Sequence, residues 1–177
     1  GASGNRIRIA SDAVSNGGDD TNLVIAFNEQ VILSRMRDKE LAPGCIILLE
    51  NKWRTDRDPK IVAEYMEVYD QLVADGYKVH EIPMEEECLK LIPDPRRGKN
   101  MFALGILANV YSLDAELGRD QIAFTFEKKG DAVIDINQQL LDAGFEWAEH
   151  NLDFKFRIPS TRPKEPKIVV SGNMAMS

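Results

Sequence analysis

The chain has 177 residues, of which 44% are hydrophobic and 29% are charged, and its formal net charge at pH 7 is -7. This length fits one α/β domain with a tail and is short for two full-sized domains. The acidic balance argues against a general nucleic-acid binder, which needs a cationic surface, and no apolar run approaches the roughly 20 residues of a membrane span. We therefore expect a soluble protein without nucleic-acid or membrane partners that can still bind small anions.

Four strands are predicted in the first half of the chain. Residues 6–10 alternate arginine and isoleucine, which predicts a half-buried strand near a sheet edge. The apolar runs 23–27 and 45–49 predict strands buried on both faces, and the first of these is expected at the centre of a parallel sheet. A fourth strand is predicted over residues 77–82.

Two helices are expected between these strands. Asn28 can cap a helix that runs to about Leu41, where a Pro-Gly pair follows. Asp58 directly before Pro59 is a strong signal for the start of the second helix, and Gly76 marks its end. Its apolar face is predicted to contain Ile61, Tyr65, Val68, Tyr69 and Leu72.

The second half of the chain has only helical patterns. We expect a short acidic helix around Cys88 and longer helices over residues 99–111, 119–129 and 131–152. The order of elements predicts an α/β fold with an open, doubly wound, mostly parallel sheet of Rossmann-like type and a helical C-terminal half. Residues 153–159 are expected to be extended, and the two prolines and mixed charge of residues 160–166 predict a linker.

Familiar catalytic and metal-binding patterns are missing from the sequence. The Gly17-Gly18 pair lacks the spacing of a phosphate-binding loop and is expected in a turn. His80 and His150 have no second ligand at metal spacing, so we expect both to pack in the core or lie on the surface. Cys45 and Cys88 form no paired motif, and with no export signal at the start of the sequence they favour reduced thiols in the cytoplasm.

A cluster of polar residues at the start of the predicted helix over residues 99–111 is the best candidate site. It contains Arg96, Arg97, Lys99 and Asn100. Cations are unfavourable at a helix N-terminus unless an anion lies opposite, and free amides with cations fit a phosphate or carboxylate. We expect these four residues to bind a cofactor anion. The alternative is that the cations pair with Asp94 or with the acidic residues 85–87, and that Asn100 only caps the helix.

The helix that follows is apolar nearly all round. Gly105 and Ala108 would allow a neighbouring helix to approach closely, so residues 101–108 are expected to pack inside the protein or in an interface. An apolar helix and an incomplete sheet would leave an exposed patch, and such patches tend to pair. We therefore predict a dimer or a larger assembly.

The sequence also resembles a known family in this region. Residues 98–105, GKNMFALG, strongly resemble a segment of the gamma-type domain of 2-oxoacid:acceptor oxidoreductases, especially the 2-oxoglutarate:ferredoxin type with fused gamma and alpha domains. Residues 6–11, 23–29 and 41–44 are similar to successive parts of that domain, and VVSGN at 169–173 is similar to the opening of the alpha, thiamine-pyrimidine-binding domain. The family's first strand and glycine-rich loop have no counterpart here.

The resemblance implies an N-terminally truncated gamma-type domain over residues 1–159, a linker at 160–166 and the start of an alpha domain at 167–177. It implies a complex that oxidatively decarboxylates a 2-oxoacid to its acyl-CoA, using thiamine diphosphate, coenzyme A and iron–sulfur clusters, and that reduces ferredoxin. Its partners would be the alpha and beta domains or subunits, between which thiamine diphosphate lies. The gamma domain would be non-catalytic, would hold no cofactor alone, and would support the coenzyme A side of the site. Arg96, Arg97 and Lys99 would contact a phosphate of coenzyme A or an acidic partner surface. The fragment alone would be inactive.

A second reading does not depend on the resemblance. The chain would be a free-standing α/β module or scaffold without a redox role, which binds a nucleotide or another anion at the carboxyl ends of its strands.

Overall fold

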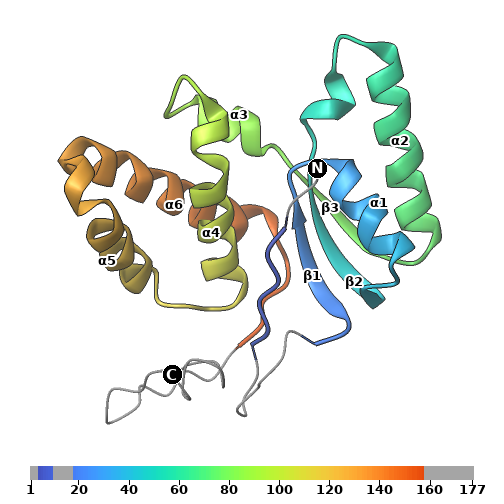
Figure 1. Ribbon diagram of the computed structural model, residues 1–177, viewed down its shortest axis with the longest axis horizontal. Coiled ribbons are helices and arrows are strands. Elements are labelled where there is room, and N and C mark those ends of the chain that lie inside the picture. The colour runs from blue at the N-terminus through green and yellow to red at the C-terminus, as the bar shows by residue number, and fades with distance from the viewer. Residues whose placement is uncertain (1–3, 10–17, 158–177) are drawn as a thin grey trace, which may run out of the picture.

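The structure, a computed structural model, describes residues 4–9 and 18–157. Three parallel strands form one sheet in the order β1 (Thr21–Ala26), β2 (Leu41–Glu50) and β3 (Lys78–Ile82). Figure 1 shows α1 (Glu29–Arg37) and α2 (Pro59–Ala74) beside the sheet and the helical second half on its other side. The expected Rossmann-like α/β fold with a helical C-terminal half is confirmed.

The central strand β2 divides the hydrophobic core into two parts, because successive side chains of a strand point to opposite faces. Cys45, Ile47 and Leu49 pack with the buried side chains of α1 and α2. Ile46 and Leu48 pack with the helices of the second half. Both faces of β2 are therefore covered, which explains its continuous apolar sequence.

The predicted starts of α1 and α2 are confirmed by their capping bonds. The Asn28 side chain accepts a hydrogen bond from the amide of Val31, and the Asp58 carboxylate accepts one from the amide of Lys60. The predicted end of α1 was wrong: the helix stops at Arg37, because β2 already begins at Leu41. The Pro-Gly pair lies within β2, where the pairing with β1 is irregular and Gly44 has a φ of 69°.

Two expectations about the N-terminal strands were wrong. Residues 4–9 form no strand, and the side chain of Ile7 is 77% exposed. Within the described sheet β1 lies at an edge, and β2 takes the central place. β1 is nevertheless apolar because both of its faces are covered. Leu23 and Ile25 pack against the part of the core that contains the helices of the second half, and Val24 and Ala26 lie in the part that contains α1 and α2. An apolar run therefore reports burial of both faces and not the number of neighbouring strands.

The helical half contains α3 (Met84–Leu89), α4 (Lys99–Val110), α5 (Ala115–Phe126) and α6 (Asp131–Asn151). Short 3-10 turns precede α2 and α4 and follow α5: η1 (Lys52–Thr55), η2 (Pro95–Arg97) and η3 (Glu127–Lys129). All four helices were expected. Only α5 begins earlier than predicted, because Asp114 caps it through the amide of Glu116.

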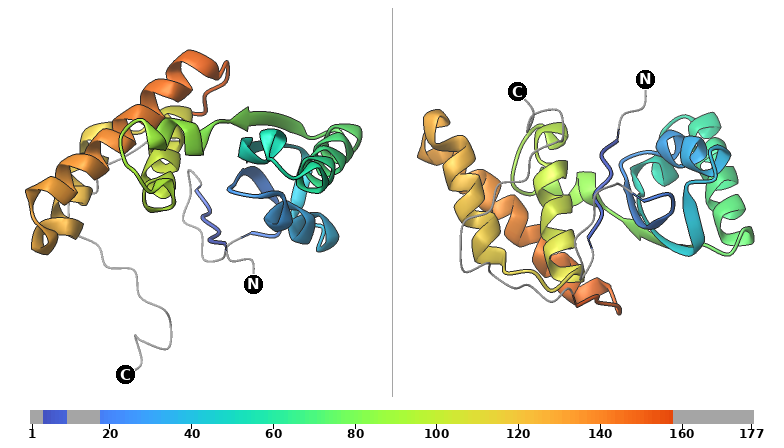
Figure 2. Two further views of the ribbon diagram at one scale, coloured as in Figure 1. Left: turned by 90° about the horizontal axis from the view of Figure 1, so that it is seen from above. Right: turned by 60° about the horizontal axis from the view of Figure 1, so that its bottom comes forward.

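α4 and α6 pack at very short distance through two glycines. A Cβ atom on Gly105 would lie 1.9 Å from the Leu141 carbonyl oxygen, and one on Gly144 would lie 2.0 Å from the Phe102 carbonyl oxygen. The prediction that Gly105 admits a close neighbour is confirmed, and that neighbour belongs to the same chain. Figure 2 shows α5 at the end of this helical layer that is farthest from the sheet.

After α6, residues 152–157 have no regular secondary structure, and the amide of Phe156 donates a hydrogen bond to the Val110 carbonyl. The predicted linker at 160–166 and the predicted alpha-domain start at 167–177 lie outside the described residues. In the described part of the chain, no helix is both long and apolar enough to span a membrane.

Candidate functional site

The four residues predicted to bind an anion do not share one environment. Arg96 and Arg97 lie in η2, and Lys99 and Asn100 lie in the first turn of α4. Arg96, Arg97 and Asn100 are exposed, whereas Lys99 is 9% exposed. Gly98 occupies the N-cap position, so the helix cap that the alternative reading assigned to Asn100 was wrong. The structure therefore separates Lys99 from its neighbours.

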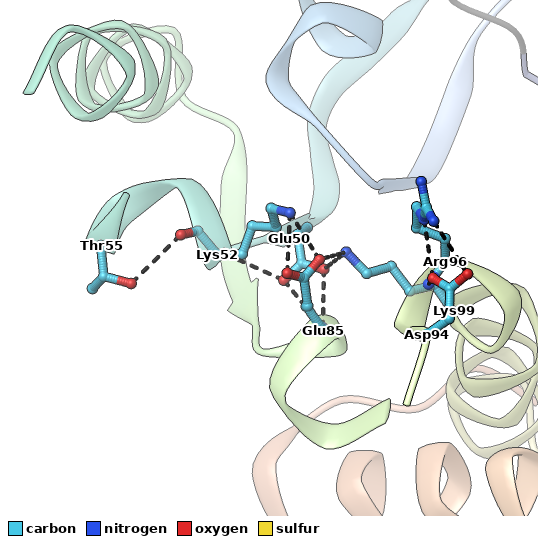
Figure 3. Close-up of polar contacts among 7 residues, drawn as sticks. All are labelled: Glu50, Lys52, Thr55, Glu85, Asp94, Arg96 and Lys99. Carbon is cyan, nitrogen blue, oxygen red and sulfur yellow. Dashed lines mark hydrogen bonds and ion pairs between the residues drawn. The ribbon is translucent and has the colours of Figure 1, made fainter. Parts of the chain in front are cut away.

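Lys99 is buried in a cluster of opposite charges at the carboxyl end of the sheet. Its Nζ atom lies 2.7 Å from Glu50 Oε2 and 2.8 Å from Glu85 Oε2. Lys52 Nζ lies 2.9 Å from the same Glu85 oxygen. Figure 3 shows the Lys99 side chain extending from the start of α4 to both glutamates. We call Glu50, Lys52, Glu85 and Lys99 the charge cluster.

The sheet itself directs Glu50 into this cluster. Glu50 is the last residue of β2 and follows the alternation of Ile46 and Leu48, so its side chain points to the α4 face. The side chain is fully buried, and its oxygens also accept hydrogen bonds from the backbone amides of Lys52, at 3.3 Å, and Glu85, at 3.1 Å. A buried carboxylate with several donors is well compensated for the loss of water.

The cluster is electrically balanced, with two carboxylates and two ammonium groups. Burial alone would lower the pKa of Lys99, but its hydrogen bonds to Glu50 and Glu85 outweigh burial and raise this pKa above its usual value. Burial alone would raise the pKa of Glu85, and the hydrogen bonds from Lys99 and Lys52 lower it instead. Both groups are therefore held in their charged forms.

The other predicted cations have different surroundings. Arg96 pairs with Asp94, with 2.9 Å between Nε and Oδ1, and this hydrogen bond lowers the pKa of Asp94. The Arg96 side chain is 86% exposed, so water screens this ion pair. Arg97 forms no ion pair with any residue that the structure describes. The pairings expected under the alternative reading are thus present for Arg96 and Lys99.

Sequence reasoning missed Glu50 and Lys52. The only signal for Glu50 was one acidic residue at the end of a long apolar run, which is also the ordinary polar end of a strand. Glu85 was interpreted as a complement to the helix dipole. Its place in the first turn of α3 agrees with that, but its side chain also accepts hydrogen bonds from Lys52 and Lys99.

Of the remaining chemical candidates, His80 and the two cysteines pack within the fold, and His150 lies on the surface. The His80 ring lies 5.0 Å from the Phe154 ring, and Nδ1 of His150 is 2.7 Å from the Glu146 carbonyl oxygen. Cys45 and Cys88 are free and buried. Within residues 4–9 and 18–157, no group of three or more histidine, cysteine, aspartate or glutamate side chains could hold a metal ion.

Comparison with known proteins identifies relatives of the chain. It is 26% identical over 187 aligned residues to the 2-oxoglutarate oxidoreductase subunit KorA of Mycobacterium tuberculosis, an alignment that covers 100% of this chain and 28% of the relative. It is 44% identical over 62 residues to the ketoisovalerate oxidoreductase subunit VorA of Methanothermobacter marburgensis, covering 34% of this chain and 13% of the relative. The chain thus spans well under half the length of these curated relatives.

A solved structure has the same fold. It is the 2-oxoglutarate:ferredoxin oxidoreductase of Magnetococcus marinus, with 2-oxoglutarate, coenzyme A and succinyl-CoA bound. The TM-score is 0.64 at 22% identity, and the match covers 86% of this chain and 24% of that one. In addition, residues 1–147 match the family model described as pyruvate ferredoxin/flavodoxin oxidoreductase. The chain belongs to the pyruvate ferredoxin/flavodoxin oxidoreductase family.

Proposed function

We propose that the chain is the gamma-type domain of a thiamine-diphosphate-dependent 2-oxoacid:ferredoxin oxidoreductase whose substrate is 2-oxoglutarate. The observation that carries this proposal is the alignment of the entire chain with a 2-oxoglutarate oxidoreductase subunit. The match to the ketoisovalerate enzyme covers only a third of the chain, which favours 2-oxoglutarate. In the complete protein, residues 160–166 would link this domain to an alpha-type domain that begins within 167–177.

The domain would support the reaction and not perform it. The complete enzyme would join a 2-oxoacid and coenzyme A, release carbon dioxide, and pass two electrons through iron–sulfur clusters to ferredoxin. Thiamine diphosphate, when bound by the alpha and beta parts, would supply the decarboxylation chemistry. The described residues offer no group that fits a metal or a cluster, so we assign them no chemical step.

The contribution of this domain would be a cationic surface for coenzyme A. Arg96, Arg97 and Asn100 are exposed side chains at the start of α4, where the helix dipole also favours an anion. Arg97 carries the strongest case because its guanidinium forms no ion pair with a described residue, and the nearby Asp94 carboxylate is bonded to Arg96. Lys99 is engaged with Glu50 and Glu85 and would act on the anion only indirectly.

Contact with partner domains or subunits is the second part of the proposal. Leu117 and Phe124 are 50% and 77% exposed. They are seven residues apart on α5, and therefore on one side of the helix. Large exposed apolar side chains on one helix face are typical of an interaction surface. We propose that the alpha or beta part of the enzyme covers this face, so that the functional protein is an oligomer.

A charge reversal in the complete enzyme tests the coenzyme A contact. Arg97→Glu should raise the KM for coenzyme A about tenfold, because a charge-assisted hydrogen bond is lost, and should leave the KM for the 2-oxoacid unchanged. Arg57→Glu is the matched control, since Arg57 is exposed in the loop before α2. An unchanged KM for coenzyme A in Arg97→Glu would overturn this part of the proposal.

A further inference from the structure

Lys99 has little capacity left for an external ligand. Its side chain is 11% exposed, and its ammonium group is within 2.8 Å of oxygens from two carboxylates, of which the Glu50 side chain is fully buried. A direct contact with coenzyme A would have to replace at least one of these bonds. The geometry therefore points to a role for Lys99 inside the protein.

The charge cluster joins four separate pieces of the chain. Glu50 ends β2, Lys52 begins η1, Glu85 lies in the first turn of α3, and Lys99 is the first residue of α4. Replacing such buried ion pairs with apolar groups often leaves a protein equally stable, so buried ion pairs can serve to fix one packing arrangement of the chain and not to add stability. In this molecule the charge cluster would fix the position of the start of α4 relative to the sheet.

A second contact also fixes the start of α4. A Cβ atom on Gly98 would lie 2.6 Å from Ile92 Cδ1 and 3.0 Å from Leu140 Cδ1, so the backbone next to Lys99 is packed tightly against Ile92 and against Leu140 of α6. Two consecutive residues thus anchor the start of α4 on the inside. Arg96, Arg97 and Asn100, which flank this anchor, are exposed.

We propose that the charge cluster positions the exposed surface of Arg96, Arg97 and Asn100, and that Lys99 is a positioning residue for an anion held there. The inference rests on the proposed function for the identity of the anion, which is coenzyme A. The anchoring of the start of α4 by the charge cluster does not depend on the proposed function, because it can be measured without any ligand.

Glu50→Gln distinguishes positioning from direct contact, because the two roles predict different changes in the KM for coenzyme A. If Lys99 bound coenzyme A directly, removing the Glu50 charge would free its ammonium group, and the KM for coenzyme A would fall or stay the same. If Lys99 is a positioning residue, Glu50→Gln and Lys99→Met should both raise this KM, by about tenfold for Lys99→Met, with a smaller change in kcat. Lys99→Arg should recover part of the loss.

The experiment uses the complete enzyme, with Lys60→Met and Glu64→Gln on the exposed surface of α2 as matched controls. Lys99→Met alone leaves a buried carboxylate without its cation, so the double variant Glu50→Gln/Lys99→Met keeps the test valid if the single variant does not fold. Because the two residues act as one unit, the double variant should lose no more coenzyme A affinity than Lys99→Met alone. A fully additive loss would contradict the proposal.

Amide hydrogen exchange supplies the ligand-free measurement. Residues 97–102 should exchange faster in Lys99→Met and in the double variant than in the parent protein, while α2 stays unchanged. Unchanged exchange at 97–102, or a KM for coenzyme A that falls or stays the same in Glu50→Gln, would overturn the positioning role. Faster exchange together with an unaffected KM in Arg97→Glu would support positioning and contradict the coenzyme A contact, so the two proposals fail separately.

Discussion

Lys99 Nζ lies 2.7 Å from Glu50 Oε2, and this ion pair ties the start of α4 to the carboxyl end of the central strand. The pair explains how a lysine can stand in the first helical turn, where the dipole disfavours a cation. Its charge is compensated from within the fold. The exposed cations next to Lys99 are therefore Arg96 and Arg97, which precede it in the chain.

The charge cluster predicts an acid-dependent loss of stability. The pKa of Glu85 is lowered from 4.5 in the folded protein, so the stability that its charged form contributes is present above pH 4.5 and is lost as the pH falls through the folded-state value. Glu85→Gln should reduce the free energy of unfolding at pH 7 by about 1 to 2 kcal/mol, since it weakens hydrogen bonds to charged groups. Urea unfolding of both proteins as a function of pH measures this.

The difference between the two proteins should shrink below pH 4.5. Glu86→Gln, at the exposed neighbouring position, is the control and should unfold like the parent protein at every pH. A difference that persists at low pH would mean that Glu85 stabilises the fold by packing and not by its charge.

Two glycines that face Leu141 of α6, Gly105 in α4 and Gly118 in α5, predict opposite effects of the same substitution. Gly105→Ala should destabilise the protein by about 3 kcal/mol, because the new Cβ would meet the backbone of Leu141 at 1.9 Å. Gly118→Ala should be neutral or stabilising by up to about 1 kcal/mol, since its Cβ would meet only the movable end of the Leu141 side chain at 2.9 Å, and alanine favours the helix. Denaturant unfolding of both variants tests this, and equal effects would be inconsistent with the packing.

The helices and strands could largely be predicted because their signals are local. Asn28 and Asp58 begin helices through bonds to amides two or three residues away, and both starts were correct. The edge position of β1 could not be predicted, since its sequence reports only that both faces are covered. The end of α1 was also missed, because the Pro-Gly pair interrupts β2 and does not terminate the helix.

The candidate site was only half predictable for a similar reason. The sequence placed Arg96, Arg97, Lys99 and Asn100 together, and acidic partners at Asp94 and 85–87 were considered. Glu50 was not predicted as a partner, because it contacts Lys99 only when the sheet and α4 are packed together. A buried partner that comes from a distant strand leaves no spacing signal in the sequence.

The two cysteines are predicted to be unreactive in the folded protein. Burial raises the pKa of both Cys45 and Cys88 to about 11, and only the thiolate reacts quickly. Iodoacetamide at about pH 8 should therefore modify neither residue in the native protein and both in urea, as read by mass spectrometry. Rapid native modification of either thiol would show that its part of the core opens.

The exposed face of α5 predicts a selective effect on assembly. Phe124→Glu should prevent association with the alpha or beta part of the enzyme and leave the fold intact, because the side chain is 77% exposed. Val73→Glu on α2 is the control, since Val73 is 50% exposed on the other side of the sheet. Light scattering after size-exclusion chromatography measures the assembly, and normal association of Phe124→Glu would rule out this face as the contact.

The assigned reaction is tested most directly with the complete protein, produced with its partner subunits, by measuring reduction of ferredoxin. We expect reduction that requires 2-oxoglutarate and coenzyme A together and that forms succinyl-CoA, with pyruvate and ketoisovalerate as poorer substrates. An assembled enzyme that reduces ferredoxin with no 2-oxoacid, or that prefers another 2-oxoacid to 2-oxoglutarate, would contradict it.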